Sequence, residues 1–219
     1  PLFPKIVVFA VPLILSGILQ LLFNAADIIV VGHFAGRESL AAVGSTTALI
    51  NLMINIFIGL SVGVNVIVAR YYGAKREKDV QDTIHTAMAL SIVSGLFLII
   101  VGQLLSRPML ELMGTPDDVI DKSTIYMRII FIGMPANMIY NFGSAILRAV
   151  GDTKRPLYFL TAAGVINVVL NLFFVIMFQM DVAGVALATA ISQAISACLV
   201  ILCLMESEGG LKLHLKALK

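Results

Sequence analysis

Six long apolar segments dominate the sequence, and their length restricts the possible folds more than any other feature. An α-helix needs about 20 mostly apolar residues to cross a bilayer, whereas a barrel strand needs about 9–11 residues of alternating polarity. None of the six segments alternates, and each is longer than a barrel strand. We therefore predict an all-α integral membrane protein, a bundle of six transmembrane helices at about 5–31, 40–70, 84–105, 123–148, 156–178 and 183–205.

The composition agrees with this prediction. Hydrophobic residues make up 59% of the 219 residues and charged residues only 13%, whereas about 25% of the residues in soluble domains are charged. The breaks between the apolar segments are short and carry turn or charge signals. We predict one six-helix lobe over residues 1–205, followed by a cytoplasmic tail or inter-lobe linker over residues 206–219.

The distribution of Lys and Arg predicts the orientation of the bundle. Eleven of the 15 basic residues fall at the N-terminus, around the second and fourth breaks and in the tail. The other four, on the opposite side, are Arg37, Arg107, Lys122 and Arg128. Because cytoplasmic loops of membrane proteins carry an excess of Lys and Arg, we expect a multi-pass protein of the inner or plasma membrane with both termini in the cytoplasm.

A single carboxylate, Asp27, lies inside the first apolar segment. A charged side chain at that depth costs roughly 2.5–3.5 kcal/mol on insertion scales, so it marks an ion or substrate path by default. Gln20 and Asn24 precede it at helical spacing, which places the three side chains on one face. Such a polar face must lie against other helices or water, and Asp27 is therefore the first candidate for binding a cation or a proton.

The other segments add amide and hydroxyl side chains that also need partners. Polar groups without a partner are costly in hydrocarbon, and some of these side chains can serve as hydrogen-bonding contacts between helices. Their number, together with a carboxylate, favours a hydrated cavity. The candidate lining residues are Gln20, Asn24, Asn51, Asn55, Asn137 and Asn141. The fifth segment also carries the polar side chains of Asn167 and Asn171, and the sixth that of Thr189.

Pro12 lies well inside the first apolar segment. A proline there removes one backbone hydrogen bond and favours a kink. Two interpretations remain open: a fixed bend, or a hinge whose angle depends on the charge state of Asp27. Protonation would remove the charge of Asp27 and change the polar partners that the helix prefers.

The sequence argues against an intramembrane enzyme. Such an enzyme needs a nucleophile with a base, paired aspartates or a metal triad. Asp27 has no second carboxylate within any predicted span, and the three histidines fall at breaks or segment ends. No HExxH or GxSxG motif occurs. We predict no enzymatic activity, no cofactor and no nucleic-acid partner.

Eight short motifs, in order over the six segments, resemble the amino-terminal lobe of a MATE (multidrug and toxic compound extrusion) transporter. No single motif is diagnostic, but their order along the whole chain is. They lie at residues 12–36, 40–44, 59–63, 69–75, 113–116, 148–156, 167–171 and 184–189.

The resemblance implies export of cationic, amphipathic compounds in exchange for inward H⁺ or Na⁺. It also implies that Asp27 binds the cation or proton, that Asn167, Asn171 and Thr189 belong to the same cation- or proton-binding cluster, and that the first helix bends at Pro12. Asn171 stands where some members have an aspartate, so this site holds one titratable group and the coupling ion stays open. No metal is implied beyond Na⁺ at Asp27.

Members of the family have two six-helix lobes, and this sequence has one. The second lobe would belong to the same longer chain, or to a second copy of a self-assembling half-transporter. A flippase for lipid-linked oligosaccharides, from the same superfamily, is the alternative function. A flippase would be expected to have a more cationic cavity, whereas the clear mid-helix charge in this chain is the negative Asp27.

Overall fold

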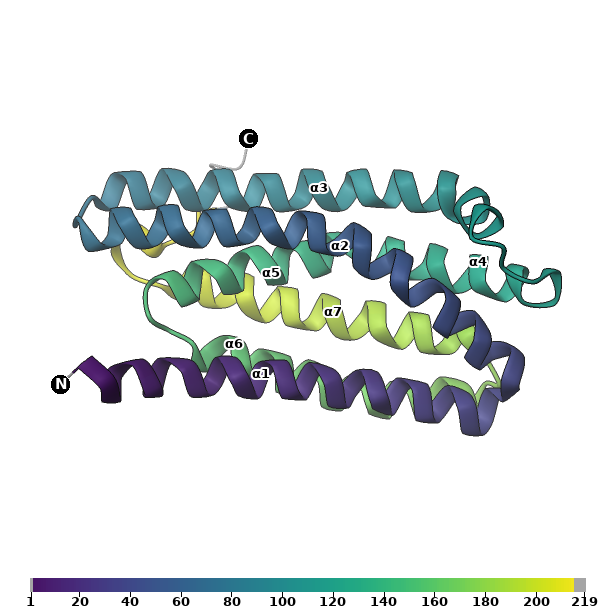
Figure 1. The fold of residues 1–219 in the computed structure, drawn as a ribbon. Coiled ribbons are helices and arrows are strands. Elements are labelled where there is room, and N and C mark those ends of the chain that lie inside the picture. The colour runs from purple at the N-terminus through teal and green to yellow at the C-terminus, as the bar shows by residue number, and fades with distance from the viewer. Residues whose placement is uncertain (1, 215–219) are drawn as a thin grey trace.

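The computed structural model describes residues 2–214, which form a bundle of helices lying side by side along one long axis (Figure 1). The fold class predicted from the sequence is confirmed. The elements are α1 (Leu2–Val30), η1 (Val31–Ala35), α2 (Gly36–Gly73), α3 (Glu77–Leu112), α4 (Asp117–Ile132), α5 (Met134–Ala149), α6 (Lys154–Leu172), η2 (Phe173–Met177), α7 (Asp181–Glu206) and η3 (Gly209–Leu211).

The helices supply six traverses of the bundle within the described residues. Four helical stretches are long and apolar enough to cross a membrane, and the bent pair α4–α5 makes a fifth. The longest stretch, Phe3–Gly73, has 71 residues, far more than one crossing needs, and it reverses direction at η1 (Figure 1). Gly36, with a φ of 85°, ends η1 in a conformation that favours glycine. The stretch therefore crosses twice, and the protein is a multi-pass membrane protein.

The N-terminal end of α1, the α2–α3 turn and the α5–α6 loop lie at the left end of the bundle in Figure 1, and the segment after α7 begins at the same end. We call this the basic end because most described Lys and Arg residues lie there. Residues 215–219 of the predicted tail lie outside the described residues. The basic end carries Lys5, Arg70, Lys75, Arg76, Lys78, Arg148, Lys154, Arg155 and Lys212.

The segment after α7 folds back onto the basic end of the bundle. Leu213 is 3% exposed, and its N–H donates to the carbonyl of Leu204 at 3.0 Å. The N–H of His214 donates to Nε2 of His85 on α3, also at 3.0 Å. The described part of the predicted tail or linker is therefore docked on the lobe.

The fourth traverse is bent by 47° where α4 meets α5. Pro135, in the first turn of α5, has no N–H and its ring conflicts with the carbonyl four residues earlier, so a straight helix cannot continue through it. Gly95 on α3 packs directly against Pro135, and a Cβ on Gly95 would overlap the backbone of Pro135. The bend is thus enclosed by close backbone packing.

Helices α3, α4, α5 and α7 carry the largest fully buried side chains of the described residues and form the packed core of the bundle. Glycines let neighbouring helices approach closely: a Cβ on Gly102 of α3 would overlap Phe131 of α4, and one on Gly143 of α5 would overlap Val200 of α7. The largest fully buried side chains are Phe131, Phe142, Ile84, Met88, Leu98, Leu110, Met127, Met134, Met138, Ile146, Leu147 and Leu204.

Helix α1 buries far fewer of its residues against the rest of the bundle than these helices do. It packs mainly on α6, where the ring of Phe23 rests against Gly164. Most of its surface is exposed in this lobe, and Pro12, Ser16 and Val30 are its buried residues among those described.

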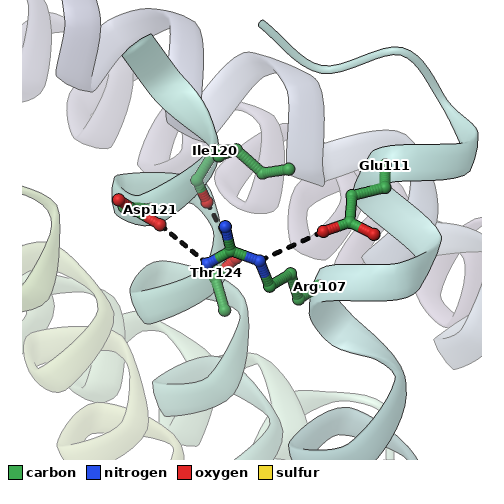
Figure 2. Close-up of polar contacts among 5 residues, drawn as sticks. All are labelled: Arg107, Glu111, Ile120, Asp121 and Thr124. Carbon is green, nitrogen blue, oxygen red and sulfur yellow. Dashed lines mark hydrogen bonds and ion pairs between the residues drawn. The ribbon is translucent and has the colours of Figure 1, made fainter. Parts of the chain in front are cut away.

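Ion pairs join the helices at the end opposite the basic end. Figure 2 shows Arg107 of α3 between Glu111 on its own helix and Asp121 of α4, at 3.1 and 2.8 Å. Lys122 of α4 pairs with Glu38 of α2 and with Asp181 of α7, each at 3.2 Å. These contacts tie four helices together at that end.

Candidate functional site: a polar cavity around Asp27

A cavity of about 260 Å³ lies between α1, α2, α5, α6 and α7. Asp27 is the one charged side chain among the residues that line it. The lining residues are Gln20, Phe23, Asn24, Asp27, Asn51, Asn137, Tyr140, Asn141, Leu160, Ala163, Gly164, Asn167, Thr189, Ser192, Gln193 and Ser196.

Helix α1 contributes Gln20, Phe23, Asn24 and Asp27 to the cavity. Their spacing of three and four residues keeps them on one helical face. Ser16 lies one turn earlier but is not among the lining residues. Its hydroxyl donates to the carbonyl of Pro12 at 2.8 Å, so this hydroxyl is used inside its own helix.

Asp27 is connected to α6 and α7 by a chain of hydrogen bonds. Nδ2 of Asn171 donates to Oδ1 of Asp27, and also to Oδ1 of Asn167 at 3.2 Å. Nδ2 of Asn167 in turn donates to Oγ1 of Thr189 at 3.2 Å. The four residues singled out in the sequence as a cation or proton site therefore lie in one network across three helices.

One acceptor in this network has no partner. Asn171 is fully buried, and its Oδ1 makes no hydrogen bond to any described residue. Leaving a buried acceptor unpaired costs about 1–3 kcal/mol. This oxygen belongs to the same amide that donates to Asp27, so a proton or a cation arriving at the carboxylate would find a second oxygen close by.

The predicted lining residues fall into two groups. Asn137 and Asn141 are half-buried, with Nδ2 of Asn141 donating to Oδ1 of Asn137 at 2.9 Å. Gln20, Asn24 and Asn51 also line the cavity but are exposed, so the cavity is open on the side of α1 and α2. Asn55 is exposed as well and is not among the lining residues.

Phe23, Tyr140 and Gln193 line the cavity but were absent from the predicted site. The hydroxyl of Tyr140 donates to the carbonyl of Pro156 at 3.0 Å, so the ring holds the cavity wall against α6. Spacing gave a signal for Phe23 and Gln193, which lie four residues from Asp27 and from Thr189. The type of residue gives no signal for Phe23 or Tyr140, because aromatic residues do not stand out among the apolar residues of a membrane helix.

Pro12 is buried within α1 and does not line the cavity. It lies 15 residues before Asp27, which is about 22 Å along a helix. Within residues 2–214, no three or more His, Cys, Asp or Glu side chains gather as they would around a metal ion.

A family model described as MatE matches residues 12–173 of the chain. The chain is 35% identical over 188 residues to "Probable multidrug resistance protein YoeA" of Bacillus subtilis, covering 84% of this chain and 41% of the relative. It is 27% identical over 187 residues to "FAD transporter" of Shewanella oneidensis, covering 83% of this chain and 41% of the relative. The chain thus spans less than half the length of these relatives, which are named as transport or resistance proteins rather than enzymes.

Among solved structures, a MATE protein in a bent conformation superimposes with a TM-score of 0.90 at 26% identity, covering 97% of this chain and 47% of the other. Such a match corresponds to one lobe of that protein. An outward-facing MATE structure matches with a TM-score of 0.90 and an inward-facing one with 0.84.

Proposed function

Because the chain belongs to the MatE family, we propose that it forms the cation-binding half of a secondary-active multidrug exporter. This exporter exchanges cytoplasmic cationic, amphipathic compounds for inward H⁺ or Na⁺, with Asp27 binding the proton or ion. The observation that supports the proposal best is a lone carboxylate in a polar cavity, hydrogen-bonded to a neutral amide whose own oxygen is unpaired.

The Asp27–Asn171 pair can serve both states of the exchange. An ionised Asp27 accepts from Nδ2 of Asn171, as in this structure. A protonated Asp27 becomes a donor and needs an acceptor, which the buried Oδ1 of Asn171 supplies after the amide turns. Na⁺ prefers oxygen ligands, and the same carboxylate and amide oxygens supply them. Loading the site therefore changes the contact between α1 and α6.

We assign the resulting movement to α1, with Pro12 as its hinge. Pro12 leaves the carbonyl of Val8 without its usual helical donor, which lowers the cost of bending at that point. Since α1 is joined to the lobe mainly through α6, a change in the Asp27–Asn171 contact can tilt α1 without disrupting the packed core.

The orientation and the partner belong to the same proposal. The basic end faces the cytoplasm, because positively charged loops are retained there, and both termini then lie on that side. A second six-helix lobe, from a longer chain or a second copy, covers the open side of the cavity at Gln20, Asn24 and Asn51. Residues 206–219 form the cytoplasmic tail or the linker to that lobe.

The charge of the cavity bears on two other possible cargoes, a lipid-linked oligosaccharide and an anionic compound such as FAD. A flippase for lipid-linked oligosaccharides must hold a pyrophosphate, and the relative named as an FAD transporter suggests an anionic cargo. The charged residue that lines the cavity of this lobe is the negative Asp27, which attracts cations instead. Cationic cargo is therefore the first choice to test.

The test is uptake of a fluorescent lipophilic cation into inverted membrane vesicles under an imposed pH gradient or, separately, an imposed Na⁺ gradient. It compares this chain alone, the chain joined to a second lobe, and Asp27→Asn in each. Asp181→Asn is the matched control, because Asp181 lies outside the cavity and pairs with Lys122. FAD is offered as an anionic cargo in parallel.

We expect uptake that depends on one of the two gradients, is abolished by Asp27→Asn and is retained by Asp181→Asn. Uptake by the chain alone would identify a self-assembling half-transporter, and uptake only with the second lobe would identify one half of an exporter. Full uptake by Asp27→Asn would contradict the proposed mechanism. Uptake of FAD alone would contradict the cationic cargo.

A further inference from the structure

Arg148, in the last turn of α5, is a charged side chain with no role in the exchange described above. It is half-buried, and its Nε is buried without a hydrogen-bond partner among the described residues. None of the ion pairs found within residues 2–214 includes Arg148. Because a guanidinium keeps its charge in proteins and buried charges are normally paired, this side chain lacks an anionic partner.

A second unpartnered polar group lies next to it. Ser144 is 1% exposed, and its Oγ lies near the hydroxyl of Tyr140 but makes no hydrogen bond of good geometry to the described part of the chain. Residues four apart on a helix have neighbouring side chains, with Cβ atoms about 5–6 Å apart. One oxyanion can therefore accept from the hydroxyl of Ser144 and from the guanidinium of Arg148 together.

Helix capping does not account for Arg148. A basic residue near a helix C-terminus often bonds the last carbonyls, but donors from elsewhere already reach several of these. The carbonyl of Ala145 accepts from Nδ2 of Asn65 on α2 at 2.7 Å. The carbonyl of Leu147 accepts from the N–H of Asp152, and that of Arg148 from the N–H of Gly151, both at 3.0 Å.

The nearest carboxylate along the chain is also engaged. Asp152 accepts from the backbone N–H of Arg155 and pairs with Nε of Arg155, both at 3.1 Å. Arg155 thus has a carboxylate partner, whereas Arg148, four residues before Asp152, has none. Of these two arginines, Arg148 is the one whose guanidinium has no carboxylate partner among the described residues and can therefore bind an external anion.

The unpartnered pair lies on α5 after the residues that line the cavity, and neither Ser144 nor Arg148 is among the lining residues. Tyr140, Ser144 and Arg148 are spaced by four residues and share one helical face, and Tyr140 lines the cavity. We infer that Ser144 and Arg148 form an oxyanion-binding site between this cavity and the basic end, which binds a carboxylate or a phosphate.

Two sources can deliver such a group. One is the acidic group of a cargo that also carries a positive charge, and this source rests on the proposed exporter function. The other is the phosphate of an anionic lipid reaching the basic end from the adjacent leaflet, where basic pockets between helices bind such headgroups. In both cases the guanidinium forms charge-assisted hydrogen bonds to the oxyanion.

The test uses two dyes that differ by one carboxylate. Rhodamine 110 carries a free carboxylate beside its cationic ring system, and rhodamine 123 is its methyl ester. Equilibrium binding of each dye is measured on the purified chain in nanodiscs, with and without phosphatidylglycerol. Native mass spectrometry measures how much phosphatidylglycerol stays bound. The variants are Arg148→Gln and Ser144→Ala, and Arg155→Gln is the control.

A site for the acid of a cargo predicts that Arg148→Gln weakens rhodamine 110 binding about tenfold and Ser144→Ala about threefold, with rhodamine 123 unchanged. A site for lipid predicts unchanged binding of both dyes and loss of retained phosphatidylglycerol in both variants. Arg155→Gln leaves all readings unchanged. Either pattern supports the oxyanion site and identifies the source of the anion.

The inference is overturned if folded Arg148→Gln changes neither dye binding nor lipid retention, or if Arg155→Gln has the same effect. If Arg148→Gln does not fold, Ser144→Ala decides by itself, since it removes a single hydroxyl. Failure of the exporter proposal is separately visible: Asp27→Asn would then leave the uptake of rhodamine 123 unchanged, whatever Arg148→Gln does to rhodamine 110.

Discussion

The contact of α1 with α6 and the core formed by α3, α4, α5 and α7 lie in one bundle of apolar helices, but they differ in how firmly the helices are held. Within α3, α4, α5 and α7, glycines bring helices together against backbone and bulky side chains. Helix α1 is held by Phe23 against Gly164 and by the hydrogen bond from Asn171 to Asp27. The difference indicates a rigid frame that carries one loosely attached helix, and that helix bears the charged group of the cavity.

The largest effect is expected from a methyl group in the rigid frame. A Cβ on Gly95 would lie 2.9 Å from the backbone nitrogen of Pro135, and backbone cannot turn aside as a side chain does. Overpacking costs typically about 1–3 kcal/mol, and we expect Gly95→Ala near the upper end. The loss in free energy of unfolding is measured in mixed micelles. Gly44→Ala is the control, because no atom lies within 4 Å of its added Cβ. Equal stability of the two variants would mean that the contact between Gly95 and Pro135 is not tightly packed.

The next effect concerns movement rather than stability. Pro12→Ala returns a backbone N–H to α1 and favours a straight helix. We expect export to fall about tenfold, equivalent to about 1.4 kcal/mol, while the unfolding temperature stays constant or rises. Pro108→Ala, in the last turns of α3, is the control and should leave export intact. Normal export by Pro12→Ala would mean that Pro12 is a fixed bend and not a hinge.

A smaller effect is expected where α1 meets α6. A Cβ on Gly164 would overlap the far edge of the Phe23 ring, and a ring at the end of a side chain can rotate away. We therefore expect Gly164→Ala to cost about 1 kcal/mol or less, and to widen the α1–α6 distance measured between spin labels. Adding Phe23→Leu should restore that distance. A destabilisation as large as that of Gly95→Ala would show that α1 is as firmly packed as the frame.

The smallest effect is expected at the ion pairs opposite the basic end. Lys122 contacts Glu38 and Asp181, and all three side chains are partly exposed. Exposed ion pairs contribute about 0.2–1 kcal/mol each, so Lys122→Met should lower the unfolding temperature by only a few degrees. The shift should shrink in high salt. A double-mutant cycle with Glu38→Gln separates the two pairs, and a loss above about 2 kcal/mol would make this end part of the rigid frame.

The cavity around Asp27 shows which lining residues can be predicted from helical periodicity and which cannot. Spacing along α1 placed Gln20, Asn24 and Asp27 on one face, and all three line the cavity. Asn55 was also predicted to line the cavity, but it is exposed and is not among the lining residues. Ser16 continues the same spacing along α1, but its hydroxyl donates to the carbonyl of Pro12 inside its own helix. Periodicity gives the side of a helix, but it does not say how far along that side a neighbouring helix lies.

Arg148 and Asp27 show a second limit of the sequence. Both are ionisable groups on mostly apolar helices, and their spacing relative to other polar residues is similar. Only the packed structure reveals that Asp27 has a hydrogen-bonded partner on another helix, whereas Arg148 has none among the described residues. Partners that come from distant parts of the chain are not encoded in local spacing.

The sequence by itself determined the family, the all-helical membrane fold and the presence of one carboxylate within the first span. The fold and the buried carboxylate can be predicted because the bilayer imposes a minimum length on apolar segments and penalises a lone charge within them. The family can be predicted because eight short motifs follow one another in order along the chain. The tertiary structure decided that α4 and α5 form one bent traverse and that Asn171 reaches Asp27 from 144 residues away. It also decided that α1 stays at the edge of the frame. These features depend on which surfaces meet, and contacts between distant helices arise only when the whole bundle packs.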